Sequence, residues 1–362
     1  MKLTLVAGAR PNFMKIAPLI HVIHQRQKEG HDLHYRLVHT GQHYDRVMSQ
    51  TFFEELNIPK PDINLECGGG TQAEQTAAIL IAFEKELQNN PADLVIVVGD
   101  VNSTMACTIV AKKLQTKVAH IEAGIRSWDM SMPEEINRMV TDILADYYFT
   151  TSEIANENLQ KYGAREEQIF FVGNVMIDTL LANLPRLQKP DFFDSLDLQK
   201  GKYLVLTMHR PANVDEAKKL KALMTQILDH VQNHPVIFPI HPRTARVFDE
   251  LGIQADHLHT VPPIGYLEFN YLVKNSLAVL TDSGGITEET TVMGIPCMTL
   301  RDNTERPETI TIGTNELVGT DPEAIPPFLD RLFAGDWKKG GVPEKWDGKT
   351  AERIIDEILS WK

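Results

Sequence analysis

The sequence contains few cysteines and no long apolar run. Three of its 362 residues are cysteines (Cys67, Cys107 and Cys297), and this odd, scattered set is not the pattern of a disulfide framework. The apolar part of the N-terminus, MKLTLVAGAR, is too short for a signal peptide, and no uninterrupted apolar stretch approaches membrane-spanning length. The sequence therefore predicts a soluble, cytoplasmic protein with reduced thiols and no membrane partner.

A surplus of basic residues is also missing, because the formal net charge is −13. Such a charge disfavours nucleic acid as a partner, so an anionic ligand must be held by local cations and helix N-termini. The chain lacks the P-loop motif, HExxH and paired CxxC motifs. Gly68–Ala73 matches GxGxxA formally, but no strong buried strand precedes it, so it does not indicate NAD. We therefore expect neither a metal nor a redox cofactor.

Strand-like and helix-like patterns alternate along almost the whole chain, which predicts a parallel α/β architecture. A break between Pro185 and Lys202 mixes prolines and charges with weak periodicity. The chain thus forms two α/β halves, and the expected ligand site is a cleft between them, at the carboxyl ends of the strands.

Two helices are marked by apolar residues at a period of 3.6. The first begins at Pro133, with Glu134 and Glu135 where negative charge is favoured, and its periodic residues are Ile136, Met139, Val140, Ile143 and Leu144. The second ends the chain, and one of its faces carries Ala351, Ile354, Ile355, Ile358 and Leu359.

The most informative segment runs from Leu280 through a Ser-Gly-Gly turn into a helical pattern. A strand that stops at Ser283, Gly284 and Gly285 leaves unpaired backbone N–H groups at a helix N-terminus, which suits a phosphate group. Glu288 and Glu289 are expected in the first helical turn, where one could bind sugar hydroxyls. An ordinary helix cap is the alternative interpretation.

Ionisable residues follow six apolar strands, at the edge where open α/β sheets bind ligands. Considered one at a time, these residues have ordinary structural interpretations: Asp100 could cap a helix near Ser103, Glu134 could interact favourably with a helix dipole, and His209 could have a structural role. Glu122 has no helix start to cap. The set suits proton transfer on a phosphorylated or nucleotide-linked substrate, with these candidates: Arg10, Lys15, Gln42, His43, Asp100, Glu122, Glu134, His209 and Arg210.

These motifs together resemble the non-hydrolysing UDP-N-acetylglucosamine 2-epimerase family. The resemblance runs essentially the full length, in the family's order, through GARPNFMKIAPL, TGQHYD, GDVNSTMA, HIEAGIRSWDMSMPEEINRMVTD, MHRPANVD, LTDSGGITEE and LRDNTERPE. It implies the GT-B fold of nucleotide-sugar glycosyltransferases, in which two Rossmann-like domains flank a central cleft. The implied domains are residues 1–172 and 173–348, with helix 349–362 crossing back to the first domain.

The resemblance also implies the roles of the site residues. Asp100, Glu122 and Glu134 match the family's catalytic carboxylates, and His209 matches its phosphate-side histidine. Glu289 would hold the ribose and Phe269 would lie near the uracil, whereas the diphosphate would contact Arg10, Ser283, Gly284, Gly285 and Arg306. Gln42 and His43 match a loop that forms a second, regulatory substrate site in many bacterial members, although the Cys67–Gln72 loop lacks the expected arginine.

The implied reaction interconverts UDP-GlcNAc and UDP-ManNAc without NAD or metal, in an enzyme that is usually a homodimer. UDP is eliminated across C1–C2 to give a 2-acetamidoglucal, and its re-addition inverts C2. The segment RSWDMSMPEEINR also resembles the branch that acts on diacetamido-uronic acid nucleotides. A glycosyltransferase of the same architecture is a further alternative, and the choice of acid and base among the carboxylates stays open.

Overall fold

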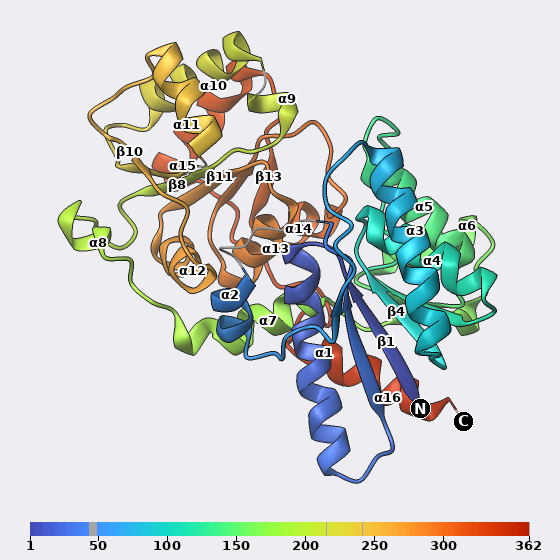
Figure 1. The fold of residues 1–362 in the computed structure, drawn as a ribbon. Coiled ribbons are helices and arrows are strands. Elements are labelled where there is room, and N and C mark those ends of the chain that lie inside the picture. Colours follow the sequence, from blue (N-terminus) through green and yellow to red (C-terminus); the bar gives the residue numbers. More distant parts are fainter. Residues whose placement is uncertain (43–48, 215, 241, 362) are drawn as a thin grey trace. The chain divides into compact units, whose positions relative to one another are not determined.

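The computed structural model describes residues 1–42, 49–214, 216–240 and 242–361. The chain divides into two compact units: unit 1 is Met1–Ala182 with Glu344–Lys362, and unit 2 is Asn183–Pro343. Each unit is built on a parallel sheet that carries helices (Figure 1). The predicted fold class, α/β with two Rossmann-like domains, is confirmed.

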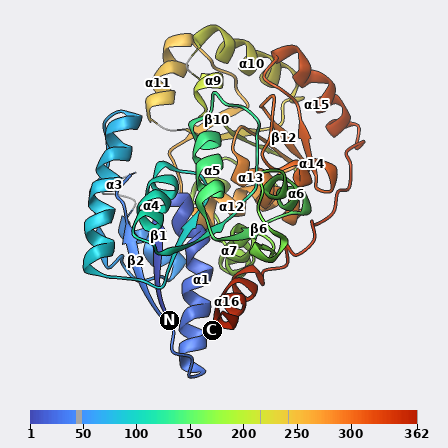
Figure 2. The ribbon, with the colours of Figure 1, turned by 90° about the vertical axis from the view of Figure 1, so that its right-hand side faces the viewer.

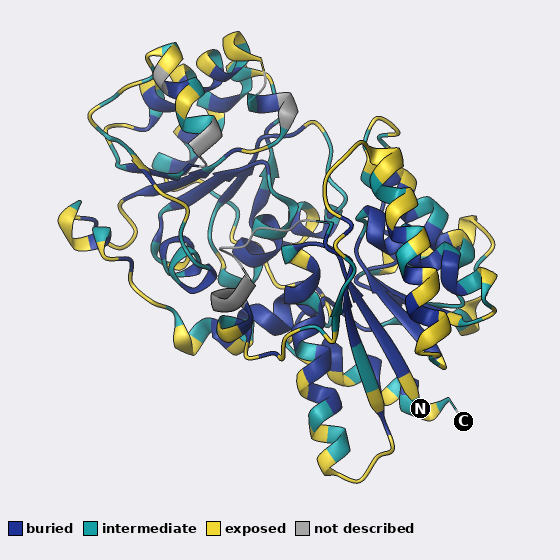
Figure 3. Ribbon diagram, in the orientation of Figure 1, coloured by how far each residue is buried: buried dark blue, intermediate teal, exposed yellow. Residues whose placement is uncertain are grey.

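Unit 1 contains, within its described residues, a parallel sheet in the order β3-β2-β1-β4-β5-β6-β7. Its strands are β1 (Lys2–Ala7), β2 (His34–His39), β3 (Ile63–Asn64), β4 (Leu94–Val98), β5 (Lys117–Ile121), β6 (Tyr147–Thr150) and β7 (Ile169–Phe171). Its helices are α1 (Arg10–Lys28), α2 (Ser49–Leu56), α3 (Gln72–Asn89), α4 (Asn102–Lys113), α5 (Pro133–Leu144), α6 (Glu153–Lys161), η1 (Glu166–Gln168), α7 (Val175–Asn183, whose last residue falls in unit 2) and α16 (Thr350–Ser360). The central strand β4 is buried along its whole length, as expected of a strand covered on both faces (Figure 3).

Unit 2 repeats this design with a sheet in the order β10-β9-β8-β11-β12-β13. Its strands are β8 (Leu204–Thr207), β9 (Val236–Pro239), β10 (Leu258–Val261), β11 (Ala278–Thr281), β12 (Cys297–Thr299) and β13 (Asn315–Leu317). Its helices are η2 (Leu184–Arg186), α8 (Phe192–Ser195), α9 (Pro211–Val214), α10 (Ala217–His230), α11 (Pro242–Leu251), α12 (Tyr266–Asn275), α13 (Gly284–Met293), α14 (Pro307–Thr311), η3 (Pro322–Ala324) and α15 (Ile325–Phe333). Successive residues of β8 enter different apolar clusters, Leu204 with α10 and α15 and Val205 with α12, so helices cover both faces of the sheet.

Strand order reverses direction once in each sheet. In unit 1 the chain leaves β1 for β2 and β3 and then returns to β4 on the other side of β1. In unit 2 the same reversal separates β8 from β11. Open α/β sheets bind ligands at such switch points, outside the carboxyl ends of the two strands. The switch points therefore identify one candidate half-site in each unit.

The C-terminal helix α16 belongs to unit 1 and packs beside α1 (Figure 2). Arg26 of α1 donates from Nε and Nη2 to the two carboxylate oxygens of Asp356, at 2.7 and 2.9 Å. Asp178 of α7 accepts the backbone N–H groups of Thr350 and Ala351, at 3.1 and 2.7 Å, and so caps α16. The two units divide after Ala182, whereas the resemblance implied a boundary after residue 172.

Replacement of Asp178 by alanine removes the acceptor of two buried N–H groups. We expect Asp178→Ala to lower the free energy of unfolding by about 1–3 kcal/mol, the usual cost of unsatisfied buried donors. Urea unfolding followed by circular dichroism measures this difference, with Asp32→Ala as the control, because Asp32 is exposed. Equal losses in the two variants would show that Asp178 does not hold α16.

Candidate functional site

The switch point of unit 1 begins with a tight turn after β1. The N–H groups of Gly8 and Ala9 donate to Oδ1 of Asn12, and Nδ2 of Asn12 donates to the Val98 carbonyl at the end of β4. A Cβ atom on Gly8 would lie 2.1 Å from Oγ of Ser103, so glycine is required here. Arg10 is the first residue of α1 and is half-buried at this edge of the sheet.

Glu122 is the most constrained residue of this half-site. It follows β5, is 2% exposed, and has a φ of 67°, which is rare for a residue other than glycine. Its carboxylate forms an ion pair with Lys15, one helical turn into α1. A Cβ atom on Gly99 would lie 3.1 Å from Nζ of Lys15, so this pair packs directly on the glycine after β4. Backbone strain of this kind persists where the surrounding structure enforces it, often at functional sites.

Asp100 does not cap a helix. The helix α4 begins at Asn102 with Val101 as its N-cap, whereas the Asp100 carboxylate accepts Nε and Nη2 of Arg138, at 3.0 and 2.6 Å. Arg138 also pairs with Glu135 at 2.5 Å and is almost fully buried. One guanidinium of α5 therefore holds Asp100 beside the end of β4.

The helix α5 has its polar face buried and its apolar face partly exposed. Its bounds agree with the predicted helix, but none of its periodic apolar residues is fully buried: Ile136 is 45% exposed, Ile143 is 63% exposed, and Met139, Val140 and Leu144 are half-buried. The buried residues are instead Glu135, Asn137, Arg138, Thr141 and Asp142. These polar residues recur at helical spacing, so the sequence indicates that α5 has a polar face. The sequence does not indicate that this face is buried.

Glu134 and Glu135 are neighbours in sequence with different environments. Glu135 is buried and accepts the N–H and Oγ–H of Ser127 and the N–H of Trp128, at 3.0 to 3.2 Å. It therefore orders the loop that precedes α5. Glu134 is half-buried in the first turn of α5, as predicted. The sequence interpretation did not assign a role to Glu135.

A buried histidine links β4, β5 and α5. The ring of His120 lies between Oδ1 of Asp142, 2.7 Å from Nδ1, and the carbonyl of Gly99, 2.8 Å from Nε2. Arg126 pairs with the other oxygen of Asp142 at 2.6 Å. Burial alone would raise the pKa of Asp142, but the charges and hydrogen bonds of His120 and Arg126 make the net shift downward. This cluster holds the backbone at Gly99, before Asp100, and at Gly124, after Glu122, and the sequence did not reveal it.

Gln42 lies three residues after the end of β2 and contacts the start of α4. Its Oε1 atom accepts the N–H and Oγ–H of Ser103, at 3.0 and 2.7 Å. His43, its predicted partner in the Gln-His loop, lies outside the described residues.

The half-site of unit 2 is formed where β8 and β11 end side by side. Thr207 and Thr281 are paired in register, and their Oγ1 atoms are 2.6 Å apart. Next along each strand, the buried carboxylate of Asp282 accepts the backbone N–H groups of His209 and Arg210 and lies 2.8 Å from Nδ1 of His209. The side chain of His209 is 64% exposed. His209 and Arg210, both predicted site residues, thus contact Asp282, the residue that precedes the Ser-Gly-Gly turn.

The residues predicted to form an anion site lie at the N-terminus of α13. Ser283 is the N-cap residue, Gly284 and Gly285 form the first two helical positions, and all three are half-buried. A Cβ atom on Gly284 would lie 3.0 Å from Oε1 of Glu305, a residue that pairs with Arg301 at 2.7 Å. A carboxylate therefore already approaches this helix end, as its dipole favours.

Glu288 and Glu289 are not in the first turn of α13, contrary to the expectation, because the helix starts at Gly284 and its first turn contains no acid. Both glutamates are buried. Glu288 forms a buried ion pair with Arg306, the arginine that was predicted to bind the diphosphate. Glu289 accepts Oη–H of Tyr266 at 2.8 Å, and its burial raises its pKa to about 7.

Phe269 lies on α12 in the same helix turn as Tyr266 and packs, half-buried, against the apolar cluster beneath that helix.

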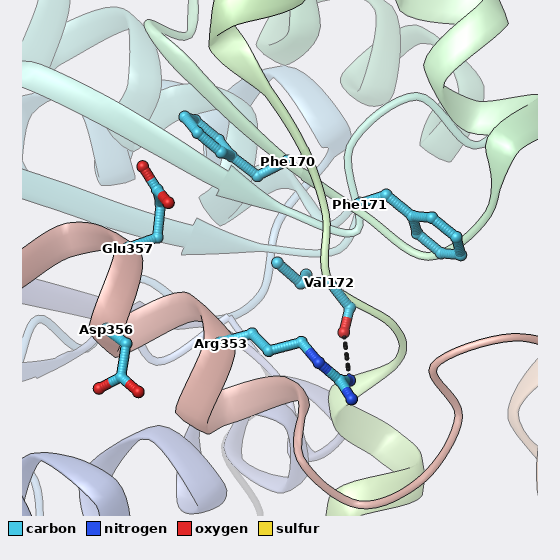
Figure 4. A pocket seen from close by; sticks show the side chains of 6 residues that line it. All are labelled: Phe170, Phe171, Val172, Arg353, Asp356 and Glu357. Carbon is cyan, nitrogen blue, oxygen red and sulfur yellow. Dashed lines mark hydrogen bonds between the residues drawn. The ribbon is translucent and has the colours of Figure 1, made fainter. Parts of the chain in front are cut away.

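A separate pocket of unit 1 contains none of the predicted residues. It has a volume of about 520 Å³ and lies between β7 and α16, lined by Phe170, Phe171, Val172, Arg353, Asp356 and Glu357 (Figure 4). Its charged groups have internal partners: Arg353 donates to the Val172 carbonyl at 2.9 Å, and Glu357 accepts Nε1–H of Trp361. We therefore assign these residues to the anchoring of α16.

The described part of the chain contains neither a membrane-spanning helix nor a metal-binding cluster. Among its residues, no helix is both long and apolar enough to cross a membrane. The same residues contain no group of three or more histidine, cysteine or carboxylate side chains arranged to hold a metal ion.

The fold and the two half-sites define an α/β protein of two Rossmann-like units, each with charged residues at its switch point. Residues 25–359 match the family model described as UDP-N-acetylglucosamine 2-epimerase. The chain therefore belongs to the UDP-N-acetylglucosamine 2-epimerase family, whose members are isomerases.

Two relatives illustrate the range of the family. The UDP-N-acetylglucosamine 2-epimerase of Methanocaldococcus jannaschii is 41% identical over 373 residues, covering 100% of this chain and 99% of the relative. The UDP-2,3-diacetamido-2,3-dideoxy-D-glucuronate 2-epimerase of Pseudomonas aeruginosa is 40% identical over 329 residues, covering 90% of each chain.

Solved structures agree with this assignment. The crystal structure of the M. jannaschii enzyme in complex with UDP-GlcNAc and UDP has a TM-score of 0.87 at 40% identity, with 100% of both chains covered. The UDP-GlcNAc 2-epimerase of Neisseria meningitidis bound to UDP-GlcNAc has a TM-score of 0.88 at 28% identity, covering 99% of this chain and 100% of that one.

The raised pKa of Glu289 predicts a pH-dependent stability. The folded state binds the proton of the Glu289 carboxyl more tightly than the unfolded chain does. The resulting stabilisation of the fold is therefore fully present below about pH 4.5 and is lost as the pH rises through about 7. Glu289→Gln should abolish this dependence, a difference of about 3 kcal/mol between pH 4 and pH 8. Urea unfolding at both pH values measures it, with exposed Glu323→Gln as the control. If the free energy of unfolding depends on pH in the same way in the wild type and in Glu289→Gln, the raised pKa of Glu289 is contradicted.

Proposed function

We propose that this protein is a UDP-N-acetylglucosamine 2-epimerase that interconverts UDP-GlcNAc and UDP-ManNAc. The observation that carries the proposal is the strained, buried Glu122 paired with Lys15, beside Asp100 held by Arg138. Carboxylates fixed in this way at a switch point suit proton transfer to a bound sugar. The names of the M. jannaschii and Salmonella typhimurium relatives support the same substrate.

The chemistry explains why several carboxylates are required. The C2 proton of the sugar is not next to a carbonyl, so the reaction proceeds by elimination. A base removes the C2 proton, the C–H electron pair forms the C1=C2 bond, and the C1–O bond breaks with its electron pair passing to the β-phosphate oxygen. Re-addition of UDP and protonation of the other face of C2 complete the inversion. Asp100, Glu122 and Glu134 supply the groups that exchange protons.

Unit 2 is assigned to the nucleotide. The N-terminus of α13, with Ser283, Gly284 and Gly285, provides backbone donors for the diphosphate. Glu289 accepts ribose hydroxyls and Phe269 lies near the uracil. The remaining groups assigned to substrate binding are Arg10, Lys15, Gln42, His43, Arg210 and Arg306. His209 stabilises or protonates the departing phosphate.

No cofactor is needed for this sequence of steps. The elimination and re-addition return every electron to the substrate, so the reaction is redox-neutral without NAD. A protonated histidine and arginines can stabilise the leaving diphosphate, so no metal is required. We place the reaction in the cytoplasm, a location that the three buried free cysteines support.

Asp100→Asn and Glu122→Gln should each lower kcat by about 10²- to 10⁴-fold, the usual contribution of a general acid or base. Proton NMR of UDP-GlcNAc in deuterium oxide, without NAD or metal, measures turnover, and the UDP-ManNAc formed should carry deuterium at C2. The control is Glu157→Gln, an exposed carboxylate on α6. Wild-type turnover in a folded variant that still binds UDP would remove that residue from the mechanism.

A diacetamido-uronic acid nucleotide is the second candidate substrate. The P. aeruginosa relative named for that sugar is 40% identical, close to the 41% of the M. jannaschii enzyme. Parallel NMR assays with both nucleotides at equal concentration decide between them through the ratio of their kcat/KM values.

A homodimer is also part of the proposal, supported by the exposed apolar face of α5. Ile136 and Ile143 lie two helical turns apart on that face, and Ile81 on α3 is 59% exposed. The helices α3, α4 and α5 pack side by side, so one layer carries these residues. Exposed apolar surface of this kind commonly marks a protein interface.

Ile143→Lys should convert the dimer to a monomer, because a lysine charge would be buried in the interface. Light scattering coupled to size-exclusion chromatography measures the mass. Ile312→Lys is the matched control, since Ile312 is exposed on unit 2. If Ile143→Lys remains a dimer, the exposed face of α5 is not the dimer interface.

A further inference from the structure

The side chain of His209 is oriented by a carboxylate that the sequence interpretation left without a role. Asp282 is completely buried immediately after β11. Its Oδ1 atom lies 2.8 Å from Nδ1 of His209, while Oδ2 accepts the N–H of Arg210 at 2.9 Å and Nδ2–H of Asn213 at 3.1 Å. The N–H of His209 also donates to Oδ2, at 3.0 Å.

These contacts define the ionisation of Asp282. Among the described residues, the neighbours that contact this carboxylate are hydrogen-bond donors, so they stabilise its ionised form. Burial alone would raise the pKa of Asp282, but the contacts with His209 and the backbone N–H of Arg210 make the net shift downward.

An ionised Asp282 determines which nitrogen of His209 carries the proton. A carboxylate accepts only, so Nδ1 must donate to it and the neutral ring is the Nδ1–H tautomer. The second nitrogen, Nε2, is on the opposite edge of the ring, and the side chain is 64% exposed. When the ring is protonated, Nε2–H is therefore the donor available to a ligand.

We propose that Asp282 is a positioning residue for His209: it fixes the ring orientation and the Nδ1–H tautomer, so that Nε2 faces the leaving diphosphate. This inference rests on the proposed epimerase function. In the elimination, the C1–O bond breaks, its electron pair passes to the β-phosphate oxygen, and Nε2–H of the imidazolium donates its proton to that oxygen. The neutral ring that remains is the tautomer that Asp282 stabilises. On re-addition, Nε2 takes the proton back.

The strand register explains why this pair forms. Thr207 and Thr281 are partners across β8 and β11, so the residues that follow them leave the sheet at the same edge. Asp282 directly precedes Ser283 and the N-terminus of α13. One carboxylate thus connects the histidine to the anion site.

A double-mutant cycle tests the proposal. Asp282→Asn should lower kcat for UDP-GlcNAc by about 10²- to 10⁴-fold, because an amide in place of the carboxylate of such a pair stabilises the wrong tautomer. In the His209→Gln background the same change should lower kcat by less than about threefold. An equal loss in both backgrounds would make Asp282 merely structural and overturn the proposal. The control is Asp321→Asn, an exposed cap of a short helix in the same unit.

A spectroscopic measurement separates this inference from the proposed function. The ¹⁵N spectrum of imidazole-labelled protein, with His209 assigned by the signal missing from His209→Gln, should show the Nδ1–H tautomer in the wild-type protein at high pH. An Nε2–H tautomer there would overturn the inference even if the enzyme is an epimerase. A wild-type protein that shows the Nδ1–H tautomer but does not turn over UDP-GlcNAc would overturn the proposed function and leave the orientation of His209 supported. The wild-type spectrum decides the question even if Asp282→Asn does not fold.

Discussion

Charges buried at the carboxyl ends of the strands are the constraint on which both half-sites depend. A buried carboxylate is costly unless opposite charges or hydrogen-bond donors surround it. In unit 1 Lys15 meets this need for Glu122, and in unit 2 backbone N–H groups and His209 meet it for Asp282. Loss of one partner would leave the other buried and unsatisfied. The geometry of each half-site is therefore held by the same contacts that make the burial of its charges tolerable.

The reversed polarity of α5 follows from this constraint. Asp100 follows β4 and His120 lies in β5, and each has a charged partner on α5. The helix provides them by turning Arg138 and Asp142 inward, and this orientation leaves Ile136 and Ile143 outside. A helix that packed its apolar face on the sheet would leave Asp100 without its guanidinium. The exposed face is thus a consequence of the site, and the proposed homodimer would cover it.

The two units use the same topology for different chemistry. Each places polar groups where strand order reverses, because the strands that flank this point open a space at their carboxyl ends. Unit 1 presents carboxylates held by cations, which suits proton exchange. Unit 2 presents a helix N-terminus, His209 and arginines, which suits an anion. The proposed substrate would need both kinds of group, because its sugar exchanges a proton and its diphosphate is an anion.

The sequence by itself determined the α/β class, the presence of two α/β halves, the strand ends that carry Glu122 and His209, and the family. These features are local: they depend on periodicity, turn residues and the order of motifs along the chain. The tertiary structure alone decided which charges pair, which face of α5 is buried and that Asp282 anchors His209. These outcomes join residues such as Asp100 and Arg138, or His209 and Asp282, that are far apart in sequence. No local pattern contains them, because burial and pairing depend on strand order and register, which arise only when the sheets form.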